Sequence, residues 1–184
     1  MKLSLLSILL GLGMAVPQVY GIARPQQFAA AARKFPRNLP LGIVLMLLGT
    51  AWFVWNVHLE SVSDFASFKP AMMVGFAAVG ILCCVFVRDF LAVRGLAVLL
   101  LLLGKLMVDT GRPHLGQTHW VWVIQTWAYL LVLAGIWFTI TPWRVRDLVN
   151  WGTATEARIR VTSTLRLAFA AFIVVLGLTA FRAM

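Results

Sequence analysis

Long apolar runs alternate with short polar segments along the chain. Six runs stand out, at residues 3–20, 39–57, 70–87, 91–108 and 120–140, and in a last stretch that ends near Phe181. Each run is roughly 17–21 residues long, and a helix of that length, at a rise of about 1.5 Å per residue, crosses the hydrocarbon core of a bilayer. The pattern therefore predicts six membrane-spanning helices.

The first run has a second interpretation. The stretch Gly21-Ile22-Ala23 that follows it has the small-x-small pattern of a signal-peptide cleavage site. We predict a retained helix and keep the signal peptide as the alternative.

Helix start and stop signals flank several of the runs. Asn38 is of a type that caps helix N-termini, and Pro40 fits the first helical turn, where its missing amide is not needed. Gly152 is expected to stop a short helix. Thr153 and Glu156, three residues apart, have the pattern of a capping box. The last helix is thus expected to begin in water before it enters the membrane.

The linkers predict how the runs are connected. Only residues 88–90 separate the third run from the fourth, so these two must fold back on each other as an antiparallel hairpin. We predict an all-α integral membrane fold, with six transmembrane helices as three hairpins and with short amphipathic basic linker helices. The hairpins, 1–57, 70–108 and 118–184, form a single polytopic membrane domain over residues 1–184.

The composition of the chain indicates whether these helices face water or lipid. Apolar residues make up 61% of the chain and charged residues 12%, with a mean hydropathy of +0.91. Soluble domains average about 45–50% apolar and about 25% charged residues. The surplus of apolar surface must therefore face lipid.

The net charge is strongly positive, with 16 Lys and Arg against 6 Asp and Glu and a formal charge of +10. Such an excess can indicate nucleic acid binding in a soluble protein, but here the basic residues lie mainly in the linkers after the first, third and fifth runs. The positive-inside rule then predicts a multi-pass protein of the inner or plasma membrane, with these linkers cytoplasmic and both termini outside. Anionic lipid headgroups, and not nucleic acid, are the expected partners of this charge.

The two longer basic linkers are candidate docking surfaces. In the first, Phe28, Ala32 and Phe35 fall on one helical face at spacings of four and three, beside cationic side chains. Such a helix binds anionic lipid, which we favour, or docks a partner protein. The candidate docking residues are Arg24, Phe28, Arg33, Lys34, Phe35, Arg37, Trp143, Arg144, Arg146 and Trp151.

A group of charged residues lies at the end of the fourth run. Lys105 and Asp109 are four residues apart, so they share a helical face and can neutralise each other. Arg112 and His114 follow and complete a possible polar site. Ionisable groups in membrane helices are functional suspects, although charges this close to the interface reach water at little cost. We expect a structural pair at the membrane edge and keep an ion or substrate site as the alternative.

Patterns typical of catalysis, metal binding or cofactor binding are absent from the sequence. Cys83 and Cys84 are adjacent, so in a helix their side chains point about 100° apart and cannot share one metal ion. The histidines, His58, His114 and His119, fall in or beside the outer loops, where they cannot ligate a haem between helices. We predict no catalytic residue, no metal and no cofactor, and leave open whether a pigment, a quinone or a specific lipid is bound.

Small residues recur on helix faces. Gly11 with Ala15, and Gly42 with Met46 and Gly49, form patches of the kind that let membrane helices pack closely. These patches favour a protein that packs through its helices.

The function predicted from these features is that of a non-enzymatic integral membrane subunit. It would be a structural, accessory or assembly component that packs against other membrane proteins or against itself. The alternative is a small oligomeric transporter or channel, with a polar site near Lys105, Asp109 and Arg112 and with a polar lining of Gln125, Thr126 and Thr139.

Overall fold

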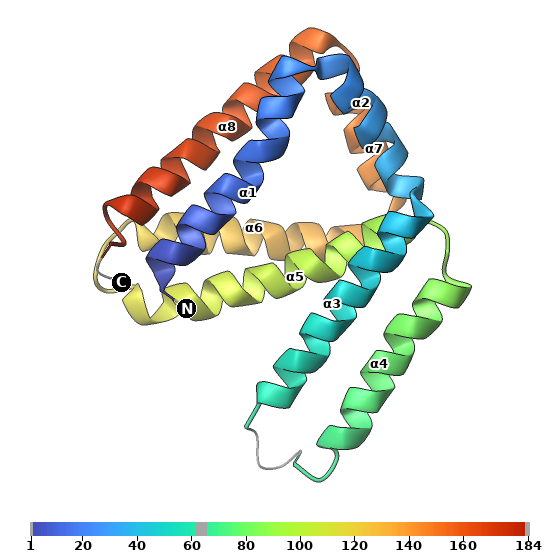
Figure 1. Cartoon of the computed structure of the whole chain (residues 1–184). Helices are drawn as coiled ribbons and strands as arrows, with labels where there is room; N and C mark the ends of the chain where they lie inside the picture. Colours follow the sequence, from blue (N-terminus) through green and yellow to red (C-terminus); the bar gives the residue numbers. More distant parts are fainter. Residues whose placement is uncertain (1, 62–65, 183–184) are drawn as a thin grey trace. The chain divides into compact units, whose positions relative to one another are not determined.

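The computed structural model describes residues 2–61 and 66–182 of the chain. In this part of the chain the regular structure is helical, and six helices are long and apolar enough to cross a membrane. They are α1 (Leu3–Ala23), α3 (Leu39–Leu59), α4 (Lys69–Phe86), α5 (Leu91–Gly111), α6 (Val121–Ile140) and α8 (Glu156–Leu178), as labelled in Figure 1. The prediction of six helices suited to spanning a membrane is confirmed.

Shorter helices occupy the long basic linkers. They are α2 (Pro25–Lys34) and α7 (Trp143–Gly152), with the 3-10 turns η1 (Phe35–Arg37) after α2 and η3 (Arg112–His114) after α5. Pro25 and Ala29 of α2 are buried, as is Val145 of α7, while most of the charged residues of both helices are exposed. Each linker helix therefore has one side covered by the protein and one side free.

Asn38 begins α3, as its sequence context predicts. Its side-chain oxygen accepts a hydrogen bond from the amide of Leu41 at 3.1 Å. Pro40 lies in the first turn, where the helix has no use for an amide donor. Both features fix the point at which the chain leaves η1 and enters the long apolar helix.

The start of α8 differs from the predicted capping box. The cap is Thr155, whose hydroxyl accepts from the amide of Arg158 at 3.3 Å, and not Thr153. Thr153 instead donates from its hydroxyl to the carbonyl of Val149 at 2.8 Å, next to the end of α7. Glu156 is then the first helical residue, so it cannot take the third position that a capping box requires.

Contacts divide the chain into two compact units, each of which is described by itself. Unit 1 contains Met1–Arg33, Gly104–Leu130 and Arg146–Met184, and unit 2 contains Lys34–Leu103 and Leu131–Val145. The predicted grouping into three hairpins of a single domain stays a prediction.

In unit 1, α1 and α8 lie side by side (Figure 1). A Cβ built on Gly11 would lie 2.8 Å from the carbonyl oxygen of Ala170, and one built on Gly177 would lie 3.0 Å from that of Ser4. A side chain at either position would push the two backbones apart, so glycine permits the contact. The pairing joins helices from opposite ends of the chain.

In unit 2, α3 packs against α4 and against the first part of α5. A Cβ on Gly42 would lie 2.6 Å from the amide nitrogen of Ala92, and one on Gly95 would lie 2.7 Å from that of Met46. A glycine of α3 and a glycine of α5 therefore lie where the two helices approach most closely. The predicted patches at Gly11 and Gly42 therefore serve contacts within the chain.

Candidate functional site

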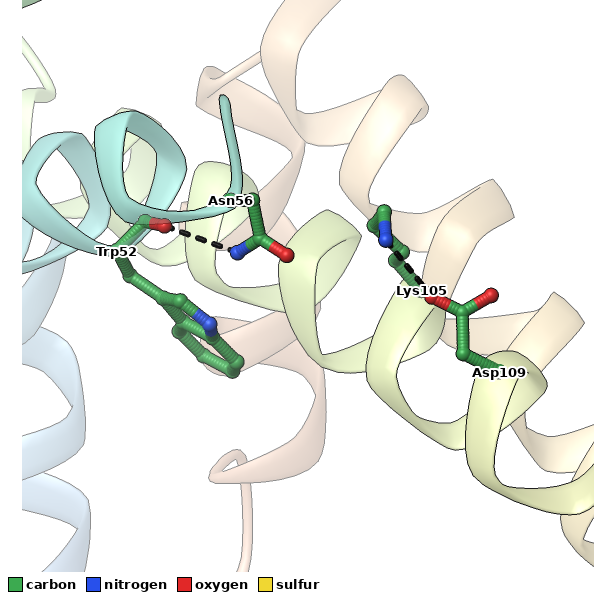
Figure 2. Close-up of polar contacts among 4 residues, drawn as sticks. All are labelled: Trp52, Asn56, Lys105 and Asp109. Carbon is green, nitrogen blue, oxygen red and sulfur yellow. Dashed lines mark hydrogen bonds and ion pairs between the residues drawn. The ribbon is translucent and has the colours of Figure 1, made fainter. Parts of the chain in front are cut away.

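The predicted ion pair between Lys105 and Asp109 is present near the end of α5, in unit 1. The Nζ atom of Lys105 lies 2.7 Å from Oδ2 of Asp109 (Figure 2). The residues are one turn apart on the same helix, so their side chains meet without any tertiary contact. Both side chains are about half exposed, at 47% and 52%, which places the pair on the surface of the helix.

Arg112 and His114 lie in η3, directly after α5, and do not extend the ion pair. The ring nitrogen Nδ1 of His114 lies 3.0 Å from Oε1 of Gln117, within hydrogen-bond distance. Arg112 is exposed, and in the described part of the chain it makes no hydrogen bond or ion pair with Asp109. The structure therefore brings together Lys105 and Asp109 but not the other two predicted residues.

Polar side chains of α6 are bonded to nearby backbone. Gln125, which is 3% exposed, donates from Nε2 to the carbonyl of Val108 at 3.3 Å. Its amide fills the space beside Gly111, where a Cβ would collide with it. The hydroxyl of Thr139 donates to the carbonyl of Gly135 at 2.8 Å. Both side chains donate hydrogen bonds to backbone carbonyls of the chain itself, so their polar groups have a structural role.

Arg33 of α2 is hydrogen-bonded within unit 1, although its side chain remains exposed. Its Nε donates to Oγ1 of Thr153 at 2.9 Å, and its Nη2 donates to the carbonyl oxygen of Thr153 at 2.6 Å. Thr153, at 7% exposed, lies in the turn between α7 and α8. The guanidinium therefore ties α2 to that turn, a structural role that the docking prediction did not include.

The remaining residues of the first basic linker differ in exposure. Phe28 and Phe35 are both partly buried, so the predicted apolar face is covered in part by the chain itself. Arg37 lies over the ring of Phe90, with Cζ 5.7 Å from the ring centroid, in a cation–π contact within unit 2. Lys34 is exposed and remains available for an external contact.

The second basic linker has exposed tryptophan side chains and exposed charged side chains on the same helix. Trp143, Trp151 and Arg144 are exposed on α7. Arg146 forms an ion pair with its neighbour Asp147, with 3.1 Å between Nη2 and Oδ1. Exposed tryptophans beside polar groups are typical of the headgroup region of a membrane.

The structure forms a pocket at the first turns of α2 and α8, in unit 1. No local pattern in the sequence indicates it. The pocket has a volume of about 310 Å³ and is lined by Arg24, Pro25, Gln26, Gln27, Glu156 and Arg160. The Nε2 atom of Gln26 donates to Oε1 of Glu156 at 2.6 Å, although 130 positions separate the two in the chain. Arg24 is a predicted docking residue, whereas the rest of the lining is found only from the structure.

The potential metal ligands are the His, Cys, Asp and Glu side chains of the residues that the structure describes. Cys83 and Cys84 are free thiols. Among the residues that the structure describes, no group of three or more His, Cys, Asp or Glu side chains is placed to hold a metal ion.

Comparison of the chain with protein-family models, with curated proteins and with solved structures found no match. The case for a function therefore rests on the residues of this chain.

Proposed function

We propose that the protein is a non-enzymatic integral membrane subunit, a structural, accessory or assembly component that packs against another membrane protein or a second copy of itself. The observation that carries this proposal is the exposure of α4. Within α4, Gly80 is the buried residue, and it lies against Thr50 of α3. A long apolar helix with so much free surface is suited to receive a partner helix in the membrane.

One face of α4 has the residue pattern of a helix-packing surface. Ala71, Gly75 and Ala78 are exposed and follow each other at spacings of four and three, so they line up along one side of the helix. Apart from its chain neighbours and the nearby backbone of α4 itself, no atom lies within 4 Å of the position that a Cβ of Gly75 would take. At Gly42 and Gly95, in contrast, a neighbouring helix already fills that space. Small residues without a neighbour allow a partner backbone to approach closely.

The test replaces Gly75 by leucine, with Ile81→Leu as the matched control. Ile81 is also exposed but lies six positions further along α4, about 120° away from Gly75 around the helix. Each protein is purified in mild detergent, its stoichiometric partners are quantified by mass spectrometry, and its copy number is measured by light scattering. We expect wild type and Ile81→Leu to keep a partner or a second copy, and Gly75→Leu to lose it. A wild type that is a lone monomer, or equal association in all three proteins, contradicts the proposal.

The proposed topology is three membrane hairpins in an inner or plasma membrane, with the basic linkers cytoplasmic and both termini outside. It is tested in a protein with Cys83 and Cys84 replaced by alanine and one new cysteine, at Lys34 or at Gln117, both of which are exposed. A thiol reagent that does not cross membranes should label intact cells at Gln117→Cys and not at Lys34→Cys. The opposite labelling reverses the topology.

A small oligomeric transporter or channel is the second candidate, and the half-exposed pair of Lys105 and Asp109 is the observation that favours it. Ionisable groups in membrane helices often mark the path of an ion or substrate. Purification separates the two candidates, because a transporter is expected as a symmetric homo-oligomer without unrelated subunits. Reconstituted into vesicles, such an oligomer should also pass ions, and Asp109→Leu should reduce that flux.

A further inference from the structure

The pocket at the first turns of α2 and α8 holds two guanidinium groups that no acid of the described chain neutralises by ion pairing. Arg24 reaches only a neutral group, since its Nη1 donates to Oε1 of Gln27 at 3.4 Å. Arg160 is exposed and makes no hydrogen bond or ion pair with the residues that the structure describes. Both side chains line the same pocket, together with one acid, Glu156, so the lining carries more positive than negative charge.

The N-terminal ends of α2 and α8 meet at the pocket, beside the C-terminal end of α1 at Ala23. The helix α2 begins at Pro25 and α8 begins at Glu156, with lengths of ten and 23 residues. The amides of a first helical turn have no acceptor within their own helix, and the helix dipole adds partial positive charge there. Glu156, the acid in the lining, accepts a hydrogen bond from the neutral amide of Gln26 and keeps its negative charge, which the two guanidinium groups outweigh by one. The pocket therefore offers donors and positive charge to an anion.

An exposed apolar track on α1 leads to this pocket. Tyr20, Val16, Gly13 and Leu9 are exposed and follow each other at spacings of four, three and four, so they lie on one face of the helix. No atom lies within 4 Å of the position that a Cβ of Gly13 would take. Arg24, four residues after Tyr20, stands at the end of the track. A tyrosine at this point is typical of the level of the lipid headgroups.

We propose that the pocket binds the phosphate of one anionic phospholipid between Arg24 and Arg160, with an acyl chain along the α1 track of Leu9, Gly13, Val16 and Tyr20. Guanidinium groups donate paired hydrogen bonds to phosphate oxygens. The first-turn amides add to them only in part, since Pro25 has no amide hydrogen and the amide of Arg158 already donates to Thr155. A soluble phosphate would use the pocket alone, whereas a phospholipid uses both the pocket and the adjoining track. The site does not depend on the partner proposed for α4.

The test measures lipid binding to the delipidated full chain in detergent, by native mass spectrometry and by the rise in melting temperature. The probes are phosphatidylglycerol, phosphatidylcholine and inorganic phosphate. We expect phosphatidylglycerol to bind and to raise the melting temperature, phosphatidylcholine to bind about tenfold more weakly, and phosphate alone to cause no shift. Arg160→Gln should weaken phosphatidylglycerol binding about tenfold, or about 1.4 kcal/mol. The melting temperature without lipid should not change, since Arg160 has no partner within the described chain.

Two further variants control for charge and geometry. Arg182→Gln removes the same charge beyond the other end of α8 and should bind phosphatidylglycerol like wild type. Arg160→Lys keeps the charge without the planar fork, so its affinity should fall between those of wild type and Arg160→Gln. If Arg160→Gln does not fold, Arg24→Gln carries the same expectation for lipid binding, although its bond to Gln27 is also lost.

Three results overturn the proposal. Equal losses in Arg160→Gln and Arg182→Gln would show general attraction by charge without a site. Equal binding of phosphatidylglycerol and phosphatidylcholine would remove the preference for an anion. Inorganic phosphate that binds as tightly as the lipid would remove the role of the α1 track.

Discussion

Arg33 and Thr153 are joined by two hydrogen bonds across 120 positions of sequence. The hydroxyl of Thr153 donates to the carbonyl of Val149, so its oxygen is oriented to accept from the guanidinium. Arg33 lies near the end of the linker helix that follows α1, and Thr153 lies shortly before α8. The contact therefore fastens the helix that follows α1 to the turn that precedes α8, in addition to the close glycine contacts between α1 and α8.

We predict that Arg33→Gln lowers the free energy of unfolding by about 1–2 kcal/mol, because hydrogen bonds from a charged donor are lost and the carbonyl of Thr153 keeps no equivalent partner. Lys34→Gln removes the same charge from the exposed neighbouring residue and should change stability by less than about 0.5 kcal/mol. Thermal unfolding of both variants in the same detergent measures the difference. Equal losses would mean that the charge of the linker, and not this contact, stabilises the protein.

The glycines between α3 and α5 should not tolerate even a methyl group. Gly42→Ala and Gly95→Ala are each expected to destabilise the protein by about 1–3 kcal/mol, because the backbones must separate or the helices must shift to admit the new Cβ. Gly13→Ala is the matched control, since no atom lies near its Cβ position, and it should be neutral or stabilising by at most about 1 kcal/mol. Unfolding in denaturant compares the three variants. A neutral Gly42→Ala would contradict the close approach of the two helices.

The helices of this protein were predictable because length and apolarity are local properties of the sequence. The run at 39–57 corresponds to α3, which ends at Leu59, and the run at 91–108 corresponds to α5, which ends at Gly111. The pairing of α1 with α8 was not predictable in the same way. In hydrocarbon, apolar side chains gain little by choosing one apolar neighbour over another, and a glycine accepts any backbone that approaches it.

The candidate sites also differ in whether they depend on local sequence or on contacts between distant segments. The pair of Lys105 and Asp109 follows from a spacing of four within one helix, so the sequence alone was enough. The pocket at Gln26 could not be predicted, because it forms only where two segments that are distant in the sequence meet. Gln26 is also neutral, so the pattern of charged residues does not single it out. The helix cap was misplaced because Thr153 and Thr155 both have the chemistry of a cap, and the path of the backbone after α7 decides between them.

The two threonines before α8 should be separable by experiment. We predict that Thr155→Ala costs about 1 kcal/mol through the lost cap, while Thr155→Ser keeps most of the stability because its hydroxyl can still accept. Thr153→Ala should also destabilise, but through its contact with Arg33. In double-mutant cycles with Arg33→Gln, Thr153→Ala should therefore be non-additive through the one hydrogen bond to its hydroxyl, because the bond to its backbone carbonyl is kept, and Thr155→Ala should be close to additive. Additivity at Thr153 would contradict the hydrogen bond to its hydroxyl.

The pair of Lys105 and Asp109 gives the sharpest separation of the two proposed functions. Loss of the ion pair in the double variant Lys105→Leu with Asp109→Leu should change the free energy of unfolding by less than about 0.5 kcal/mol, because a half-exposed pair on one helix contributes no more than that. Partner association, measured as for Gly75→Leu, should also be unchanged, since the pair lies on α5 and the proposed packing face lies on α4. Ion flux in reconstituted vesicles is the decisive measurement. A double variant that folds and assembles like wild type but loses a flux that wild type shows would reject a purely structural pair and favour the transporter. Equal flux in wild type and the double variant, or no flux in either, would support a structural role for the ion pair. In that role the two residues neutralise each other's charge near the end of a membrane helix.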